Sequence, residues 1–172
     1  MKTIAIHIKQ QRRIIYPVII LLALFAAQGV FLFVFPQQEV KENLEFYTIL
    51  PISVIKIAEM EISVEVAKTR DDIVRGLSGR TSLPRGRGML FIHDKPGLYA
   101  YWMKEMKFSI DILWIGSDGQ VIDIAENVVP ESYPQTFAPS RPARYVLEVP
   151  AGFSREAGLL RGMSVDMKNI QD

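Results

Sequence analysis

An uncharged stretch of about 22 residues, from Ile14 to Phe35, places the strongest constraint on how this chain folds. As a helix it would be roughly 33 Å long, which is enough to cross the hydrocarbon core of a bilayer. The sequence therefore predicts a transmembrane helix over residues 14–35, with the lipid bilayer as its partner. This helix divides the chain into a short segment before it and a long one after it.

A cleaved signal peptide is the alternative explanation for this stretch. The apolar core of such a peptide is about 7–15 residues long and ends in small residues at the cleavage site. Ala27-Gln28-Gly29 could serve as that site. Cleavage there would leave the apolar residues 30–35 exposed at the new N-terminus. We therefore favour an uncleaved signal anchor.

Charged residues on the two sides of the stretch predict its orientation. The segment before it is basic, whereas the segment just after it contains several glutamates and a single lysine. The positive-inside rule places residues 1–13 in the cytoplasm and the rest of the chain outside the cell membrane. Pro36 and Pro51 interrupt regular structure, so we expect residues 36–58 to be a juxtamembrane linker. Residues 59–172 are then an extracytoplasmic domain.

Composition excludes several classes of function. The net charge of the 172-residue chain is +1, which gives no reason to expect a nucleic-acid partner. The sequence has no cysteine, so disulfides, thiol chemistry and thiolate metal sites are ruled out. The two histidines are His7 and His93, and a lone histidine in a domain is more often structural than catalytic. We therefore predict neither a metal nor a cofactor.

Short apolar runs separated by turn signals follow from residue 59 onward. Thr69 and Asp72 resemble the cap of a short helix, and Ser117-Asp118-Gly119 resembles the turn of a hairpin. We expect the proline-containing stretch 129–142 to be an irregular loop. The pattern predicts an α+β, predominantly β domain, a compact small barrel or sandwich of about seven strands and two short helices. The expected strands cover residues 62–66, 89–92, 98–103, 110–115, 121–124, 143–149 and 164–167, and the two helices begin after Thr69 and at Ala151-Gly152.

Asp111 is the first candidate for a functional residue, because it interrupts an apolar strand. Strand geometry places it on one face with Leu113, while Ile110 and Ile112 share the other face. A buried carboxylate needs a partner, so Asp111 is either a structural residue, in an ion pair or bonded to backbone amides, or an acid, base or ligand contact. The cations available to it are Lys104, Lys107 and Arg144.

Two further pairs of residues complete the candidate site. Arg144 and Glu148 are four apart on one strand and so face the same way, as an ion pair or as the polar floor of a groove. Trp102 and Trp114 are expected in the core, although an aromatic ring beside Lys104 could stack on a sugar or peptide. We assign no catalytic residue. The predicted polar cluster, which is also the candidate ligand-binding site, consists of Trp102, Lys104, Asp111, Arg144 and Glu148.

These side chains come from separate parts of the chain, and burying each alone would cost free energy. We therefore predict that they lie together and satisfy one another, with Asp111 accepting hydrogen bonds from Arg144 or Lys104. The cluster would line the main concavity of the domain, beside residues 129–142.

Eight short segments of this region form a recognisable series: residues 65–67, 75–77, 88–91, 102–104, 110–115, 126–128, 143–148 and 151–152. They resemble the motifs of a widespread prokaryotic family, DUF192 (domain of unknown function 192, also called uncharacterised protein family 0127). The resemblance extends from about Ile62 to Met167 and implies a predominantly β domain that is often exported or anchored. It implies no established activity or cofactor. The chain departs from the family pattern at Gly162-Met163, where Gly-Asp is usual.

We expect from these features a membrane-anchored extracytoplasmic domain that acts as a non-catalytic binding or accessory module of the cell envelope. Its candidate partners are an envelope polymer or a membrane protein. Two alternatives stay open. One is an acid–base hydrolase that uses Asp111 with Lys104 or Arg144. The other is a structural subunit of a membrane complex.

Overall fold

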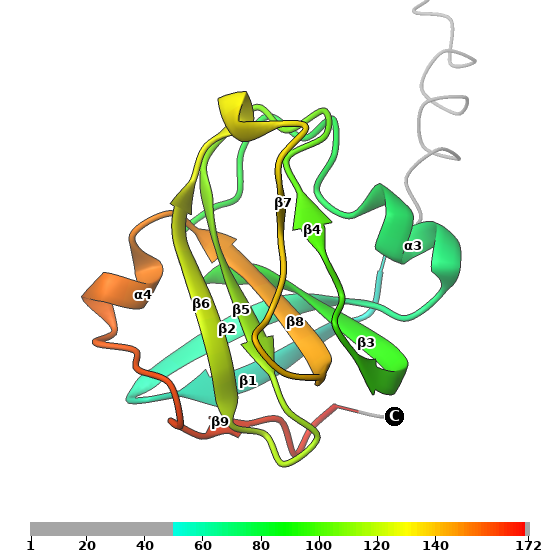
Figure 1. Cartoon of the computed structure of the whole chain (residues 1–172). Helices are drawn as coiled ribbons and strands as arrows, with labels where there is room; N and C mark the ends of the chain where they lie inside the picture. The colour runs from blue at the N-terminus through cyan, green and yellow to red at the C-terminus, as the bar shows by residue number, and fades with distance from the viewer. Residues whose placement is uncertain (1–49, 171–172) are drawn as a thin grey trace, which may run out of the picture. The chain divides into compact units, whose positions relative to one another are not determined.

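The computed structural model describes residues 50–170, which form a β-rich domain (Figure 1). Its main element is one curled seven-stranded sheet, a half-barrel, to which two short α-helices are added. Residues 1–49 and 171–172 lie outside the described part, and the predicted membrane helix over residues 14–35 falls among them. Between residues 50 and 170, no helix combines the length and apolar composition that crossing a membrane requires.

The strand order in the large sheet is β6-β5-β8-β3-β2-β1-β9. β2 and β3 are parallel, and all other neighbours are antiparallel. β4 and β7 form a separate two-stranded sheet. The strands are β1 (Ile52–Ile57), β2 (Met60–Ala67), β3 (Arg87–Gly97), β4 (Tyr101–Trp102), β5 (Ile110–Ile115), β6 (Val121–Val128), β7 (Thr136–Phe137), β8 (Ala143–Pro150) and β9 (Val165–Asp166).

The two edges of the curled sheet approach each other at one place, where backbone hydrogen bonds join the turn between β5 and β6 to the segment before β9. The Val165 N–H donates to the Gly119 carbonyl at 2.8 Å, and the Gly162 N–H donates to the Val121 carbonyl, also at 2.8 Å. Gln120 and Ser164 form an isolated antiparallel bridge between these two bonds. The turn that joins β5 to β6 is therefore attached to the segment that leads into β9.

The first helix begins where the sequence predicts it, and the second begins at Phe153, just after the predicted start at Ala151-Gly152. α3 (Arg70–Arg75) is capped by Thr69, whose hydroxyl accepts a 3.2 Å hydrogen bond from the Asp72 N–H. It ends at Gly76, whose positive φ of 47° suits glycine and whose N–H donates to the Asp72 carbonyl. α4 (Phe153–Glu156) follows β8, and a 3-10 helix, η1 (Pro130–Ser132), lies in the loop after β6.

Alternation along the strands gives the sheet two apolar faces. The inner face of the curl carries residues such as Leu90, Leu113 and Leu147. The outer face carries residues such as Met89 and Trp114 and is covered by residues of α3 and of the segment around β4. Trp114 is 1% exposed, as predicted for a core residue.

The domain differs from the sequence-based expectation at three places. Residues 52–57, which we assigned to the linker, form β1 and pair with β2 along their whole length. Burial alternates along β1, but two of its exposed residues, Ile52 and Val54, are apolar, so the sequence shows no clean alternation of apolar and polar residues here. In the expected strand 98–103 only β4 is a strand, and it belongs to the small sheet. Its partner β7 lies in the stretch expected to be an irregular loop.

Candidate functional site

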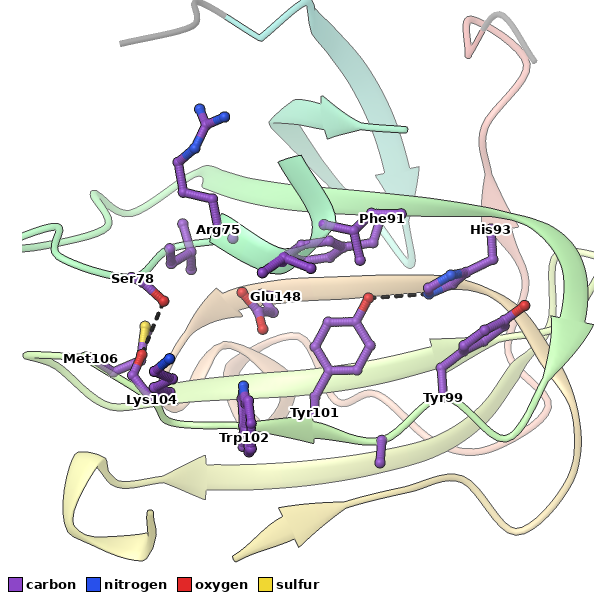
Figure 2. A pocket seen from close by; sticks show the side chains of 15 residues that line it. Arg75, Ser78, Phe91, His93, Tyr99, Tyr101, Trp102, Lys104, Met106 and Glu148 are labelled. Atoms are coloured by element: carbon purple, nitrogen blue, oxygen red, sulfur yellow. Dashed lines mark hydrogen bonds between the residues drawn. The ribbon is translucent and has the colours of Figure 1, made fainter. Parts of the chain in front are cut away.

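A cavity of about 300 Å³ lies on the outer face of the sheet, between α3 and the segment around β4 (Figure 2). One wall is the C-terminal part of α3 with the turn that follows it. The other is the segment 99–106, which includes β4. β3 and β8 form the floor through Phe91, His93 and Glu148. The volume lies at the lower end of the range for small-molecule sites.

Two hydrogen bonds join the walls of the cavity. The Ser78 hydroxyl donates to the Lys104 carbonyl at 2.9 Å, and the Gly79 N–H donates to the Glu105 carbonyl at 3.0 Å. The turn after α3 is thereby tied to the segment after β4. These bonds fix the width of the cavity at one side, where Lys104 and Met106 lie.

Strand register places Glu148 on the floor of this cavity. Residues opposite one another in a sheet point to the same face. Glu148 lies opposite Met89 of β3 on one side and Ile112 of β5 on the other, and Met89 lies opposite Glu65 of β2. These four residues form a row across the outer face, in which a carboxyl group stands between two apolar neighbours.

Glu148 is a largely buried acid on the floor of the cavity. It is 5% exposed, and no residue of the described domain forms a hydrogen bond with its side chain. Burial raises the pKa of Glu148 to about 8, and the nearby charge of Arg80 opposes that rise only in part. Its carboxyl group therefore holds a proton in most molecules at neutral pH, and in Figure 2 it lies in the middle of the cavity.

The guanidinium groups closest to this floor are engaged with other carboxylates. Arg80 binds Glu65 through two hydrogen bonds of 2.6 and 2.8 Å, and the hydrogen bond from Arg80 holds the pKa of Glu65 below its usual value. Arg75 contacts Asp72 at 3.3 Å, and its guanidinium points away from Glu148 in Figure 2. Glu148 thus lies near positive charge but has no direct ion-pair partner among the described residues.

Three aromatic side chains occupy the end of the cavity where β3 and β4 meet. The rings of His93 and Tyr99 stack with centroids 3.4 Å apart, and His93 Nε2 shares a 3.2 Å hydrogen bond with the Tyr101 hydroxyl. Burial lowers the pKa of His93, although Asp94 opposes this, and burial raises the pKa of Tyr101. Both groups are therefore uncharged at neutral pH.

The mouth of the cavity is apolar and partly open to solvent. Trp102 is 50% exposed, contrary to the expectation that it lies in the core, and its ring meets that of Tyr133 edge-on at 5.7 Å. Val74 of α3 is 74% exposed and also lines the cavity. These two side chains leave apolar surface at the mouth that a ligand could contact. Trp102 reaches the surface because β4 belongs to the small sheet and not to the large one.

Asp111 lies on the opposite, inner face of the sheet and is fully buried. Three backbone N–H groups donate to its side chain: those of Asn127 and Gly152 to Oδ1, at 2.8 and 3.1 Å, and that of Ser154 to Oδ2, at 2.8 Å. They connect β5 to the end of β6 and to the start of α4. This pattern is that of a structural carboxylate, the first of the two interpretations that the sequence left open.

The predicted contact between Asp111 and Arg144 is wrong. Asp111 lies opposite Val149 of β8, and Arg144 lies five positions away along that strand, about 17 Å at 3.4 Å per residue. The odd spacing also places Arg144 on the outer face. Arg144 lies over the ring of Tyr145, 5.4 Å from its centroid. Lys104 lines the cavity and so is separated from Asp111 by the sheet.

The structure therefore brings together three of the five predicted residues, Trp102, Lys104 and Glu148, around one cavity, and places Asp111 and Arg144 elsewhere. Sequence reasoning gave no role to Tyr99 and Tyr101, and it favoured a structural role for His93. The spacing of the two tyrosines is a usable signal, because residues two apart in an extended segment face the same side.

The cavity has acid–base groups but no activated nucleophile. Ser78 has the one aliphatic hydroxyl among the lining residues, and it donates to a backbone carbonyl. Within residues 50–170, no group of three or more metal-ligating side chains is placed to hold a metal ion. The chemistry available at the floor is that of Glu148, which can donate a hydrogen bond when protonated and attract a cation when ionised.

The chain is similar to a protein family and to two solved structures. The DUF192 family profile, described as uncharacterised ACR, matches residues 53–167. A protein of unknown function from Novosphingobium aromaticivorans is 28% identical, with a TM-score of 0.65 over 68% of this chain and 86% of that one. A candidate transcription regulator from Sinorhizobium meliloti is 26% identical, with a TM-score of 0.68 over 72% and 99%. A comparison with curated proteins gave no match.

Proposed function

We propose that this chain, which belongs to the DUF192 family, is a non-catalytic binding module that takes a small ligand into the cavity between α3 and β4. The proposal includes its location, outside the cell membrane and anchored by residues 14–35. The uncharged stretch and the basic residues before it support that location. The cavity supports the binding role independently of where the domain lies.

Glu148 is the observation that carries the binding role. A buried polar group without a hydrogen-bond partner costs free energy, and proteins usually satisfy such groups. Glu148 is 5% exposed, no residue between 50 and 170 forms a hydrogen bond with its side chain, and it lines a cavity large enough for a small molecule. A bound ligand that supplies the missing hydrogen bond or charge would remove this cost.

The surroundings of Glu148 favour binding over catalysis. Acid–base catalysis of hydrolysis needs a positioned nucleophile or water together with a base. Asp111, the base of the alternative hydrolase, has its oxygens occupied by three backbone donors on the other face of the sheet. Aromatic side chains such as Trp102, Tyr99 and Tyr101 instead offer a ligand a large contact area with little loss of side-chain entropy.

A ligand screen on the full-length chain tests the binding role, because the two tryptophans report on different places. Trp102 is half exposed at the mouth, and Trp114 is buried in the core. We expect small ligands found by NMR screening to shift the indole N–H resonance of Trp102 and to leave that of Trp114 unchanged. A Trp102→Phe variant assigns the responding signal. If a broad library shifts neither signal, or shifts both alike, the cavity is not a binding site.

Protease accessibility tests the proposed location. Protease added to intact spheroplasts should digest the domain that contains residues 50–170, while a cytoplasmic marker protein stays intact. Protection of the domain until the membrane is permeabilised would mean that the orientation is wrong.

A further inference from the structure

We propose, building on the binding role above, that the cavity binds an organic ammonium group, with the Glu148 carboxylate as its counter-ion and aromatic rings around it. The ligand is thus a small organic cation. The proposed function states that the cavity binds a small ligand, and this inference adds that the ligand carries a positive charge. It follows from which groups around the cavity already have partners and which do not.

The floor of the cavity lacks a cation. An ionised carboxylate buried at Glu148 needs a positive charge nearby, and the neighbouring guanidinium groups are held elsewhere, Arg80 by Glu65 and Arg75 by Asp72. In the absence of ligand the carboxyl group keeps a proton instead. A ligand ammonium group would supply the positive charge, and the proton would leave to solvent.

The walls suit a cation as well. A cation is attracted to the face of an aromatic ring, most strongly to that of tryptophan. Trp102 lines the mouth and Phe91 the floor, while Tyr99 and Tyr101 lie at one end. Figure 2 shows Phe91, Tyr101 and Trp102 near Glu148, with Tyr99 farther away beside His93. The carboxyl group and the aromatic rings thus surround one small space, an arrangement that recognises ammonium groups.

The remaining titratable groups that face Glu148 do not favour an anion. From β3 comes His93, whose pKa is lowered by burial, and from the segment around β4 come Tyr99 and Tyr101, of which Tyr101 has its pKa raised by burial. Lys104 is the exception, a solvent-exposed cation at the mouth. Its charge is screened by water, and it would repel the ligand modestly. A carboxylate ligand would have to lie next to the buried acid.

Three probes of one shape and different charge separate the possibilities. Choline keeps its positive charge at every pH, 3,3-dimethylbutan-1-ol is its neutral counterpart, and 3,3-dimethylbutanoate is an anion of similar size. Titrations of the full-length chain, followed by Trp102 fluorescence and by calorimetry, would give the three affinities. We expect choline to bind at least tenfold more tightly than either of the others at pH 8.5.

The pH dependence identifies Glu148 as the counter-ion. Choline affinity should rise by up to about tenfold per pH unit between pH 6 and 8, because binding then requires loss of one proton, and should level off above pH 8. The calorimetric heat should change with the ionisation enthalpy of the buffer, as expected when a proton is released. An affinity that is independent of pH, or that falls as the pH rises, would overturn the inference.

Three substitutions complete the test. Glu148→Gln, which keeps the size of the side chain, should weaken choline binding at pH 8.5 at least tenfold and abolish its pH dependence. Glu59→Gln, at a side chain that is 96% exposed, should change neither. Lys104→Met should leave choline affinity equal or higher, whereas a large loss would point to an anionic ligand. Thermal melts confirm that each variant is folded, and the wild-type pH profile tests the inference without any variant.

The outcomes distinguish this inference from the proposed function. If the neutral alcohol or the anion binds as tightly as choline and changes the Trp102 signal, the cavity is a binding site but not one for cations. If no probe and no member of the screening library changes that signal, the binding role fails as well. Tight choline binding that Glu148→Gln does not weaken would place the cation elsewhere in the domain and overturn the inference.

Discussion

Two buried carboxyl groups lie almost side by side in this sheet and have opposite environments. Asp111 of β5 precedes Ile112, which lies opposite Glu148 of β8, so the two acids are neighbours that point to different faces. Asp111 is completely buried and accepts three backbone hydrogen bonds. Glu148 is 5% exposed and faces a cavity, and its side chain forms no hydrogen bond within the described part of the chain. Burial alone therefore does not distinguish a structural acid from a candidate functional one.

The difference arises from what covers each face. At the inner face, the start of α4 and the end of β6 bring backbone N–H groups to Asp111. The hydrogen bonds of its carboxylate therefore connect β5, β6 and α4. At the outer face, α3 and the segment around β4 contribute mainly side chains, and they leave a cavity over Glu148. Backbone amides satisfy an acid permanently, whereas a cavity leaves the partner to be supplied from solution.

The largest expected change in stability comes from comparing the two tryptophans, one in the packed core of the outer face and one at the open mouth of the cavity. We expect Trp114→Ala to destabilise the domain by about 3–5 kcal/mol, because it removes a fully buried ring, and the 2.9 Å hydrogen bond from its Nε1 to the Tyr99 carbonyl is lost as well. Trp102→Ala should cost about 1 kcal/mol or less. Denaturant unfolding of the full-length variants, followed by circular dichroism, measures both. Equal losses would mean that Trp102 is also a core residue.

The next largest effect concerns Asp111. We expect Asp111→Asn to destabilise the domain by about 3 kcal/mol, since the amide NH₂ would face the Ser154 N–H and the charge-assisted bonds would weaken. Asp118→Asn is the matched control, because the Asp118 side chain accepts one backbone hydrogen bond in an exposed turn. It should cost less than about 1 kcal/mol. A neutral effect of Asp111→Asn would contradict the structural role.

Glu148→Gln should stabilise the domain, whereas Asp111→Asn should destabilise it. The native state holds a proton on Glu148 up to about pH 8, whereas the unfolded chain releases it near pH 4.5, so wild-type stability falls as the pH rises between these values. We expect the variant to match wild type at pH 4.5 and to be more stable by about 2 kcal/mol at pH 8.5, allowing for water in the cavity. Urea unfolding at both pH values measures this. A variant less stable at pH 8.5 would show that Glu148 has a partner.

The smallest expected effect concerns the influence of the Arg80 charge on the pKa of Glu148. Arg80 lowers the pKa of Glu148 through its charge, so Arg80→Met should raise that pKa further, by less than about one unit. Loss of the partly exposed pair with Glu65 should cost about 1 kcal/mol. A carbon-13 NMR titration of the glutamate carboxyl groups would follow the Glu148 signal. An unchanged or lower pKa would mean that the charge of Arg80 does not reach the cavity.

Local patterns in the sequence were enough to identify most of the elements. Strands β2, β5, β6 and β8 match predicted strands, because alternation and turn residues are properties of neighbours along the chain. The cap at Thr69 was predicted for the same reason. Alternation also assigned Asp111 to the face of Leu113, and Arg144 and Glu148 to a common face, as the register confirms.

Only the tertiary structure decided which acid is satisfied. In the sequence, Asp111 and Glu148 look alike, since each stands between apolar residues in a strand. Their partners come from distant segments, the start of α4 for Asp111 and the two walls of the cavity for Glu148. The register of β5 against β8 and the position of α3 depend on contacts between segments that are far apart in the sequence, and no local pattern encodes them. The sequence determined that two acids are buried, and the fold determined which of them faces an open cavity.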